Sequence, residues 1–154
     1  MLDDLTIINS MIGEHKAIRG HLKLLQNSLS TLKDVRTQGQ RQALTEKLRE
    51  LQLVMSYLEE GLRNHYTHEE KVMAPLLGNP LLEAFQIEHK KVEERFGKAK
   101  SLFANLSKKS VKELPGTHSE IKRVIREICE LVEDHSLKED TFFTLVKSAL
   151  EKKR

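Results

Sequence analysis

The stretch Asn64-His65-Tyr66-Thr67-His68-Glu69-Glu70-Lys71 decides the fold, because it places polar side chains where a helix buries apolar ones. Before it, apolar residues recur at alternating spacings of four and three, which is the apolar face of a long amphipathic helix. These residues are Leu44, Leu48, Leu51, Met55, Leu58 and Leu62. The next two steps are His65 and Glu69, and the series resumes at Val72. Burying an unpaired imidazole and carboxylate is costly, so we expect something to bind them.

The composition is typical of an all-helical protein. The chain has 154 residues, of which 38% are hydrophobic and 32% charged, with only 7 glycines and 3 prolines. Leu, Glu and Lys dominate, and these residues favour helices. The length suits one compact core, so we expect a single domain over residues 1–154. We detect no internal repeat.

Charge and cysteine content narrow the function classes. The formal net charge is +3, and basic and acidic residues are interleaved, so no basic stripe indicates nucleic-acid binding. No apolar run reaches the length of a membrane helix, and residues 1–4 do not resemble a signal peptide. The single cysteine, Cys129, cannot form an internal disulfide. We therefore expect a cytoplasmic protein with no nucleic-acid or membrane partner, and the sequence identifies no protein partner.

Apolar periodicity predicts four helices. They cover about residues 4–33, 38–73, 80–106 and 118–149. Thr37–Gln40 and Thr117–Glu120 have the pattern of capping boxes, and Asn79-Pro80 offers an N-cap followed by proline at the first helical position. Pro75 and Gly78 are expected to stop the second helix. Four long helices with short polar connections pack most economically as an up-down-up-down four-helix bundle, an all-α fold.

Three of the predicted helices carry a His-x-x-x-Glu pair on the apolar face, and the first helix carries His15 alone. A spacing of four places both side chains of a pair on one face, about one turn apart. The pairs are His65/Glu69, His89/Glu93 and His135/Glu139. A lone pair of this kind is usually exposed, but here all of them coincide with the apolar face. We therefore interpret the set as metal ligands.

The predicted ligands lie level along the bundle except for His15. His65, His89 and His135 are nearly symmetric about the connections between their helices. His15 is offset from His65 by about 12 Å, at 1.5 Å per residue. A stagger of the helix ends or the connection must absorb this offset.

The ligand types indicate the metal. Imidazoles and carboxylates without a thiolate suit iron, manganese or zinc rather than calcium or magnesium. Several carboxylates permit two ions with shared oxygens, and we assign Glu69 and Glu139 as the bridges. Glu93 competes with Val92 for the apolar face but is kept as a ligand, and Asp140 is an alternative bridge. The expected metal ligands are His15, His65, Glu69, His89, Glu93, His135 and Glu139.

Three other histidines lie outside this set. His21 is about 120° away from His15 around the first helix. His118 belongs to a predicted capping turn. His68 is next to the apolar face and is expected at most to orient a ligand carboxylate from a second layer.

At these residues the sequence resembles the hemerythrin-like family of cation-binding four-helix bundles. The family pattern is an isolated His in the first helix, His-x-x-x-Glu in the second, a His-containing pair in the third and a His-carboxylate pair in the fourth. The match runs from His15 to Glu139, nearly the whole chain. The resemblance implies a non-haem di-iron centre (Fe2+/Fe3+) with an oxo or hydroxo bridge and bridging carboxylates. Its members bind or sense oxygen, sense iron, or handle nitric oxide and peroxide.

Two positions depart from the oxygen-carrying members. Their third helix has His-x-x-x-His, and the second of those positions is Glu93 here. Their fourth helix has Asp at the spacing of Asp140, whereas the apolar face here favours Glu139. A ligand set richer in carboxylate favours ferric iron, which argues against reversible oxygen carriage.

Three functional hypotheses stay open. The first is a di-iron protein that binds oxygen or a related small molecule for sensing, storage or protection. The second is a di-iron enzyme acting on peroxide or nitric oxide, or an iron donor in iron-sulfur cluster repair. The third is a metal-free structural or partner-binding bundle whose buried histidines and carboxylates pair across helices.

Overall fold

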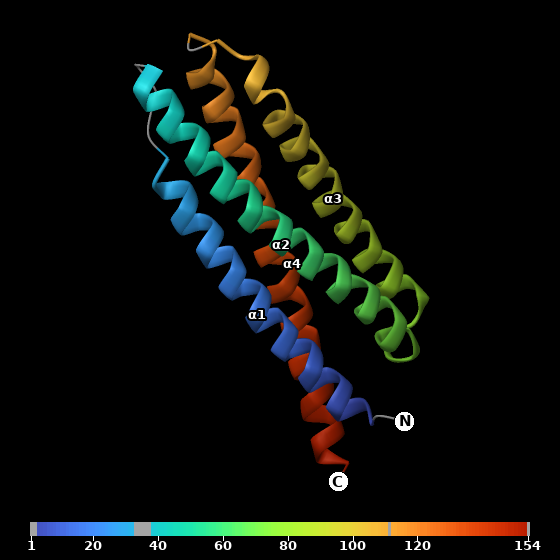
Figure 1. The fold of residues 1–154 in the computed structure, drawn as a ribbon. Coiled ribbons are helices and arrows are strands. Elements are labelled where there is room, and N and C mark those ends of the chain that lie inside the picture. Colours follow the sequence, from blue (N-terminus) through green and yellow to red (C-terminus); the bar gives the residue numbers. More distant parts are fainter. Residues whose placement is uncertain (1–2, 33–37, 111, 154) are drawn as a thin grey trace.

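The computed structural model describes residues 3–32, 38–110 and 112–153. These residues form four long α-helices and one turn of 3-10 helix (Figure 1). The bounds are α1 Asp4–Ser30, α2 Gln38–Leu77, α3 Asn79–Ala104, η1 Leu106–Lys108 and α4 Leu114–Lys152. Each α-helix packs against its neighbours in the chain, and α4 closes against α1. The predicted four-helix bundle is therefore confirmed.

α1 begins and packs as its sequence predicts. The Thr6 backbone N–H donates a 2.7 Å hydrogen bond to Oδ1 of the N-cap residue Asp3, which satisfies one of the free amides of the first turn. The buried face consists of Ile8, Met11, His15, Ile18, Leu22, Leu25, Leu29 and, just past the helix, Leu32. These residues recur in the sequence at the spacing of one helix face, and every one of them is buried, His15 included.

The corner between α2 and α3 differs from the prediction. α2 continues through Pro75 to Leu77, so Pro75 does not end the helix. Gly78 makes the turn with φ 73° and is the N-cap of α3, while Pro80 lies in its first turn. The expected N-cap at Asn79 is therefore wrong by one residue. A positive φ suits glycine because it has no Cβ to clash.

The start of α4 also differs. The helix begins at Leu114 with Pro115 in its first turn, where the missing backbone N–H is not needed. Thr117 lies inside this helix, and its Oγ1 donates to the Glu113 carbonyl oxygen. The expected capping box at Thr117–Glu120 is therefore wrong. The other expected box, Thr37–Gln40, begins outside the described residues.

Helix lengths explain how His15 reaches the level of the other ligands. α2 has 40 residues and α1 has 27. α2 consequently extends past the end of α1 (Figure 1). This stagger absorbs the predicted offset, and the Nε2 atoms of His15 and His65 lie 3.0 Å apart.

Two apolar clusters fill the core on either side of a buried layer of polar side chains. We name this layer the polar layer, and it consists of His15, His65, Glu69, His89, His135 and Glu139. The larger cluster occupies the part of the bundle that contains the end of α1 and the start of α2. The smaller one consists of Ile8, Met11, Met73 and Phe143. The apolar spacing in the fourth helix predicts Phe142 on the buried face, but Phe143 is the fully buried residue and Phe142 is only partly buried. Among the helices described, none is long and apolar enough to cross a membrane.

Candidate metal centre

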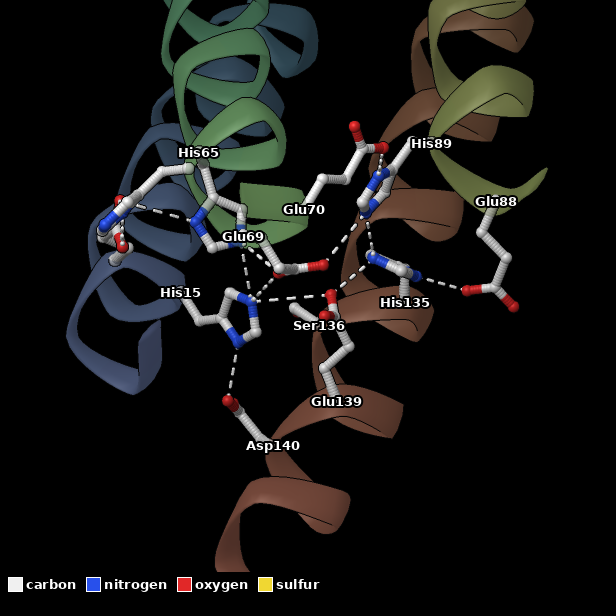
Figure 2. A network of polar contacts seen from close by, with 12 residues as sticks. His15, His65, Glu69, Glu70, Glu88, His89, His135, Ser136, Glu139 and Asp140 are labelled. Atoms are coloured by element: carbon white, nitrogen blue, oxygen red, sulfur yellow. Dashed lines mark hydrogen bonds and ion pairs between the residues drawn. The ribbon is translucent and has the colours of Figure 1, made fainter. Parts of the chain in front are cut away.

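The polar layer contains two groups of side chains that overlap (Figure 2). We name them the His15 group and the His89 group. The His15 group is His15, His65, Glu69 and Glu139, and the His89 group is Glu69, His89, His135 and Glu139. Within each group the potential ligand atoms all lie within 4.8 Å of one another. Glu69 and Glu139 belong to both groups and are completely buried.

The helical spacing places each of these side chains on the bundle axis. Every α-helix contributes one histidine, and α2 and α4 each add a glutamate one turn later. The structure therefore brings together six of the seven predicted ligands.

Glu93 is the predicted ligand that the structure does not bring to the centre. Its side chain is exposed, and it belongs to neither group among the described residues. Val92 is buried in its place, with 2% exposure. The step of three residues from His89 keeps Val92 on the apolar face, so Glu93 turns outward. The arrangement does not support Glu93 as a ligand.

The four histidines present Nε2 to the shared carboxylates. His65 Nε2 lies 2.9 Å from a Glu69 oxygen, and His89 Nε2 lies 3.2 Å from the other. On the opposite side, His135 Nε2 lies 2.5 Å from Glu139. His15 Nε2 is 3.6 Å from the same glutamate. Nitrogen and oxygen lone pairs thus converge on a common centre.

The other ring nitrogen, Nδ1, meets a carboxylate outside the layer. His15 Nδ1 donates to Asp140 at 2.7 Å, and Arg19 holds the second oxygen of Asp140, also at 2.7 Å. A carboxylate can only accept, so this contact places the proton on Nδ1 and leaves Nε2 free to bind a metal. Asp140 therefore orients His15 and is not positioned as the alternative bridge.

The same arrangement recurs on α3 and α4. His89 Nδ1 lies 3.2 Å from Glu70, and His135 Nδ1 makes a short contact with Glu88. Lys138 holds the other oxygen of Glu88 at 2.9 Å. Each of these carboxylates comes from a helix next to that of its histidine, so helix packing orients the rings.

The fourth contact is looser. His65 Nδ1 lies 3.6 Å from Glu14, an ion-pair distance rather than a hydrogen bond. His68 approaches the same carboxylate at 3.1 Å. His68 thus contacts a carboxylate beside His65 and not a glutamate of the polar layer, and 42% of its side chain is exposed.

We name Glu14, Glu70, Glu88 and Asp140 the outer carboxylates. Each helix supplies one, and it serves the histidine of the next helix in chain order, with α4 returning to α1. Each is also a direct sequence neighbour of a residue in the polar layer. Glu-His-Lys occurs at 14–16 and 88–90, and His-x-x-x-Glu followed by an acid occurs at 65–70, 89–94 and 135–140. Acidic neighbours of the layer residues are therefore visible in the sequence, but the pattern alone does not identify the outer carboxylates, because Glu94 at the 89–94 occurrence is exposed.

Burial and crowding shift the pKa values of the two shared glutamates in opposite directions. Burial and the adjacent Glu69 carboxylate raise the pKa of Glu139 to about 12. The pKa of Glu69 lies below its usual value. Burial by itself would raise this pKa, but the contacts with His15 and the other imidazoles outweigh burial. Two neighbouring buried carboxylates cannot both be charged cheaply, so without a cation this pair retains a proton.

Aromatic rings line the layer. Phe143 stacks on His15 at 5.9 Å, and Phe85 meets His135 edge-on at 5.6 Å. Tyr66 stacks on His89 with ring centres 3.7 Å apart. Burial, together with the nearby carboxyl groups of Glu139 and Glu69, raises the pKa of Tyr66, so its phenol stays protonated. With the apolar clusters on either side, these rings keep the layer dry.

The family model described as the Hemerythrin HHE cation binding domain matches residues 6–146, a range that contains the whole polar layer. The chain belongs to this family. The comparison finds no curated protein and no solved structure that matches the chain.

The buried side chains fit the cation that the hemerythrin HHE family implies. Among the described residues, all four oxygens of Glu69 and Glu139 lack a hydrogen bond of normal geometry although they are buried. Buried polar atoms without partners are costly unless an ion binds them. In this HHE domain, four histidines surround the oxygens of Glu69 and Glu139, and the outer carboxylates orient their rings. Oriented imidazoles beside carboxylate oxygens are suitable metal ligands, so these groups can hold a metal ion.

The remaining histidines of this HHE domain lie outside both groups. His21 is exposed, as predicted. His118 is buried near the start of α4, with 3% exposure, because α4 starts earlier than predicted and places it inside the helix. Its expected place in a capping turn is therefore wrong.

Proposed function

We propose that this hemerythrin HHE protein binds two iron ions, one in each group, and uses them to bind oxygen or a related small molecule. The observation that carries the proposal is the convergence of four Nε2 atoms on the shared carboxylates of Glu69 and Glu139. Each ion would receive two imidazoles and a share of two carboxylates. This set is smaller than the six ligands that iron commonly takes, so positions stay open for a small molecule.

The ligand chemistry supports iron. Imidazole nitrogen and carboxylate oxygen suit iron, manganese and zinc, whereas a thiolate, which soft metals prefer, is absent from both groups. Cys129 is buried elsewhere in α4. The carboxylate share favours the ferric state because hard oxygen ligands stabilise higher charge.

The side chains around the two groups would balance the charge of the ions and fix the orientation of the imidazoles. Glu69 and Glu139 would neutralise part of the charge of both ions, and the outer carboxylates hold the imidazoles with Nε2 inward. The aromatic rings and apolar clusters exclude bulk water. Bound iron would supply one-electron redox chemistry and open coordination positions.

One observation favours a second candidate, an enzyme acting on peroxide or nitric oxide. The two groups are matched, with two imidazoles each and the same two glutamates. Both ions would therefore have open positions, which suits reactions that use two metals together. Catalytic turnover distinguishes this enzyme from a protein that only binds its ligand.

The test is reconstitution with ferrous iron under anaerobic conditions, followed by counting bound iron by mass spectrometry. We expect two ions per chain in the wild type, and fewer than one in Glu69→Gln or Glu139→Gln, since each change removes a shared ligand. Glu93→Gln is the matched control, because Glu93 is exposed, and it should keep both ions.

Two results would contradict the proposal. The first is a wild-type protein that binds fewer than two ions. The second is loss of iron from the Glu93→Gln control. If the loaded wild type consumes many equivalents of hydrogen peroxide or nitric oxide and Glu139→Gln does not, the enzyme is favoured over the binding protein.

A further inference from the structure

The hydroxyl group of Tyr66 is buried without a hydrogen-bond partner. Only 6% of Tyr66 is exposed, and its phenol oxygen has no partner among the described residues. A buried hydroxyl gives up its hydrogen bonds to water and here gains nothing in return. Phenylalanine would provide the same ring without this cost. The hydroxyl therefore lacks a partner that the described part of the chain could supply, and a bound molecule would provide one.

The ring of Tyr66 forms one wall of the His89 group. It stacks on His89 with ring centres 3.7 Å apart and an interplanar angle of 12°. It also meets His135 edge-on, at 5.9 Å and 88°. These are the two imidazoles of the group, so a molecule bound there lies beside Tyr66. The ring is held by two contacts, which gives its hydroxyl a defined position.

Tyr66 also lines a cavity. It lies between α2 and α3, has a volume of about 200 Å³, and is lined by Tyr66, Val92 and Gly97, among others. The exposed Glu93 also lines it. One water molecule occupies about 30 Å³ in the liquid, so this volume corresponds to roughly six water molecules and has room for a small molecule of a few heavy atoms.

We propose that the Tyr66 hydroxyl donates a hydrogen bond to the small molecule bound at the His89 group. The inference rests on the proposed function, because it requires metal in that group. It adds a residue that selects the ligand: a donor here favours molecules with an anionic or electron-rich end, such as azide, reduced oxygen species or nitric oxide.

The experiment compares Tyr66→Phe with Tyr57→Phe. Tyr57 is on the same helix and is 61% exposed, which makes it the matched control. Azide is the probe, and its Kd is measured by difference absorption on the iron-loaded protein. We expect Tyr66→Phe to keep two ions and to raise the azide Kd about tenfold, the effect of one lost hydrogen bond. Tyr57→Phe should leave the Kd unchanged.

Melting of the metal-free protein supplies a readout independent of iron. Because the hydroxyl has no partner among the residues that the structure describes, Tyr66→Phe should leave the Tm of the metal-free protein unchanged or higher. A clearly lower Tm would show that the hydroxyl is bonded within the chain and would overturn the proposal.

Two further results overturn this inference alone. One is an azide Kd that is the same in the iron-loaded wild type and in iron-loaded Tyr66→Phe. The other is a visible phenolate-to-iron absorption band that disappears in Tyr66→Phe, because Tyr66 would then be a ligand and not a donor. Wild-type protein that binds no iron would contradict both this inference and the proposed function.

Discussion

At the scale of single residues, the centre depends on histidines that use both ring nitrogens. Nε2 faces the shared glutamates while Nδ1 faces an outer carboxylate, and the contact at Nδ1 selects the tautomer that can bind a metal. The pKa of His15 reflects this environment. Burial lowers it, but the contacts with Glu69 and Asp140 outweigh burial, so the pKa lies above its usual value.

Replacing an outer carboxylate should weaken metal binding without removing a ligand. We expect Glu88→Gln to lower metal affinity about 10–100-fold, because the amide no longer stabilises the Nδ1 proton of His135. Competition with a chelator measures this affinity. Glu94→Gln, at an exposed position of the same helix, is the control and should bind as the wild type does. Equal loss in the two variants would mean that the Glu88 contact has no specific role.

Metal binding should release protons. Glu139 has a pKa of about 12 without metal, so it carries a proton at pH 7 that a cation must displace. Protons are released more easily at higher pH. The affinity for the metal should therefore increase about tenfold per pH unit for each proton released. Titration of the metal-free protein with ferrous iron between pH 6 and pH 8 measures this slope. A flat profile would show that Glu139 is already ionised before metal binds.

At the scale of elements, the corner at Gly78 sets how α2 and α3 meet. Its φ of 73° lies in the left-handed region, where a Cβ is strained. The short turn brings His65 and His89 to one level on adjacent antiparallel helices. Backbone conformation at one glycine thus contributes to the geometry of the centre.

Two glycine substitutions should have opposite effects on stability. Gly78→Ala is expected to lower the free energy of unfolding by about 1–2 kcal/mol, because alanine is strained at positive φ. Gly61→Ala, in the interior of α2 with open space around an added Cβ, should raise it by about 0.5–1 kcal/mol. Urea unfolding measures each change. Stabilisation by Gly78→Ala would contradict the conformation described here.

At the scale of the whole molecule, a polar layer interrupts an otherwise continuous apolar core. The two apolar clusters hold the helices together on either side. The layer between them contains buried carboxylate oxygens that form no normal hydrogen bond within the described ranges of the chain. The metal-free protein therefore carries a destabilising centre. A ligand that binds only the folded state stabilises it by mass action.

Iron should accordingly raise the melting temperature. At a free concentration one hundred times the Kd, one site adds about 2.7 kcal/mol. For a chain of this size, that corresponds to an increase in Tm of roughly 5–10 °C. Calorimetry with and without ferrous iron measures the change, and a chelator should reverse it. An identical Tm in all conditions would favour the metal-free bundle.

The sequence by itself determined the four helices, the buried face of α1 and six side chains of the polar layer. This was possible because helical periodicity is local: a residue three or four positions from a buried one lies on the same face. His15, His65 and Glu139 could be placed in this way without knowledge of the neighbouring helices.

Only the tertiary structure decided which residues near the apolar face turn inward and which contact a neighbouring helix. Glu93 turned outward although its spacing matched that of Glu69, and Asp140 reached across to His15. The contact between Glu88 and His135 likewise joins two helices. Such contacts depend on the stagger and rotation of packed helices, which the pattern along one helix does not contain.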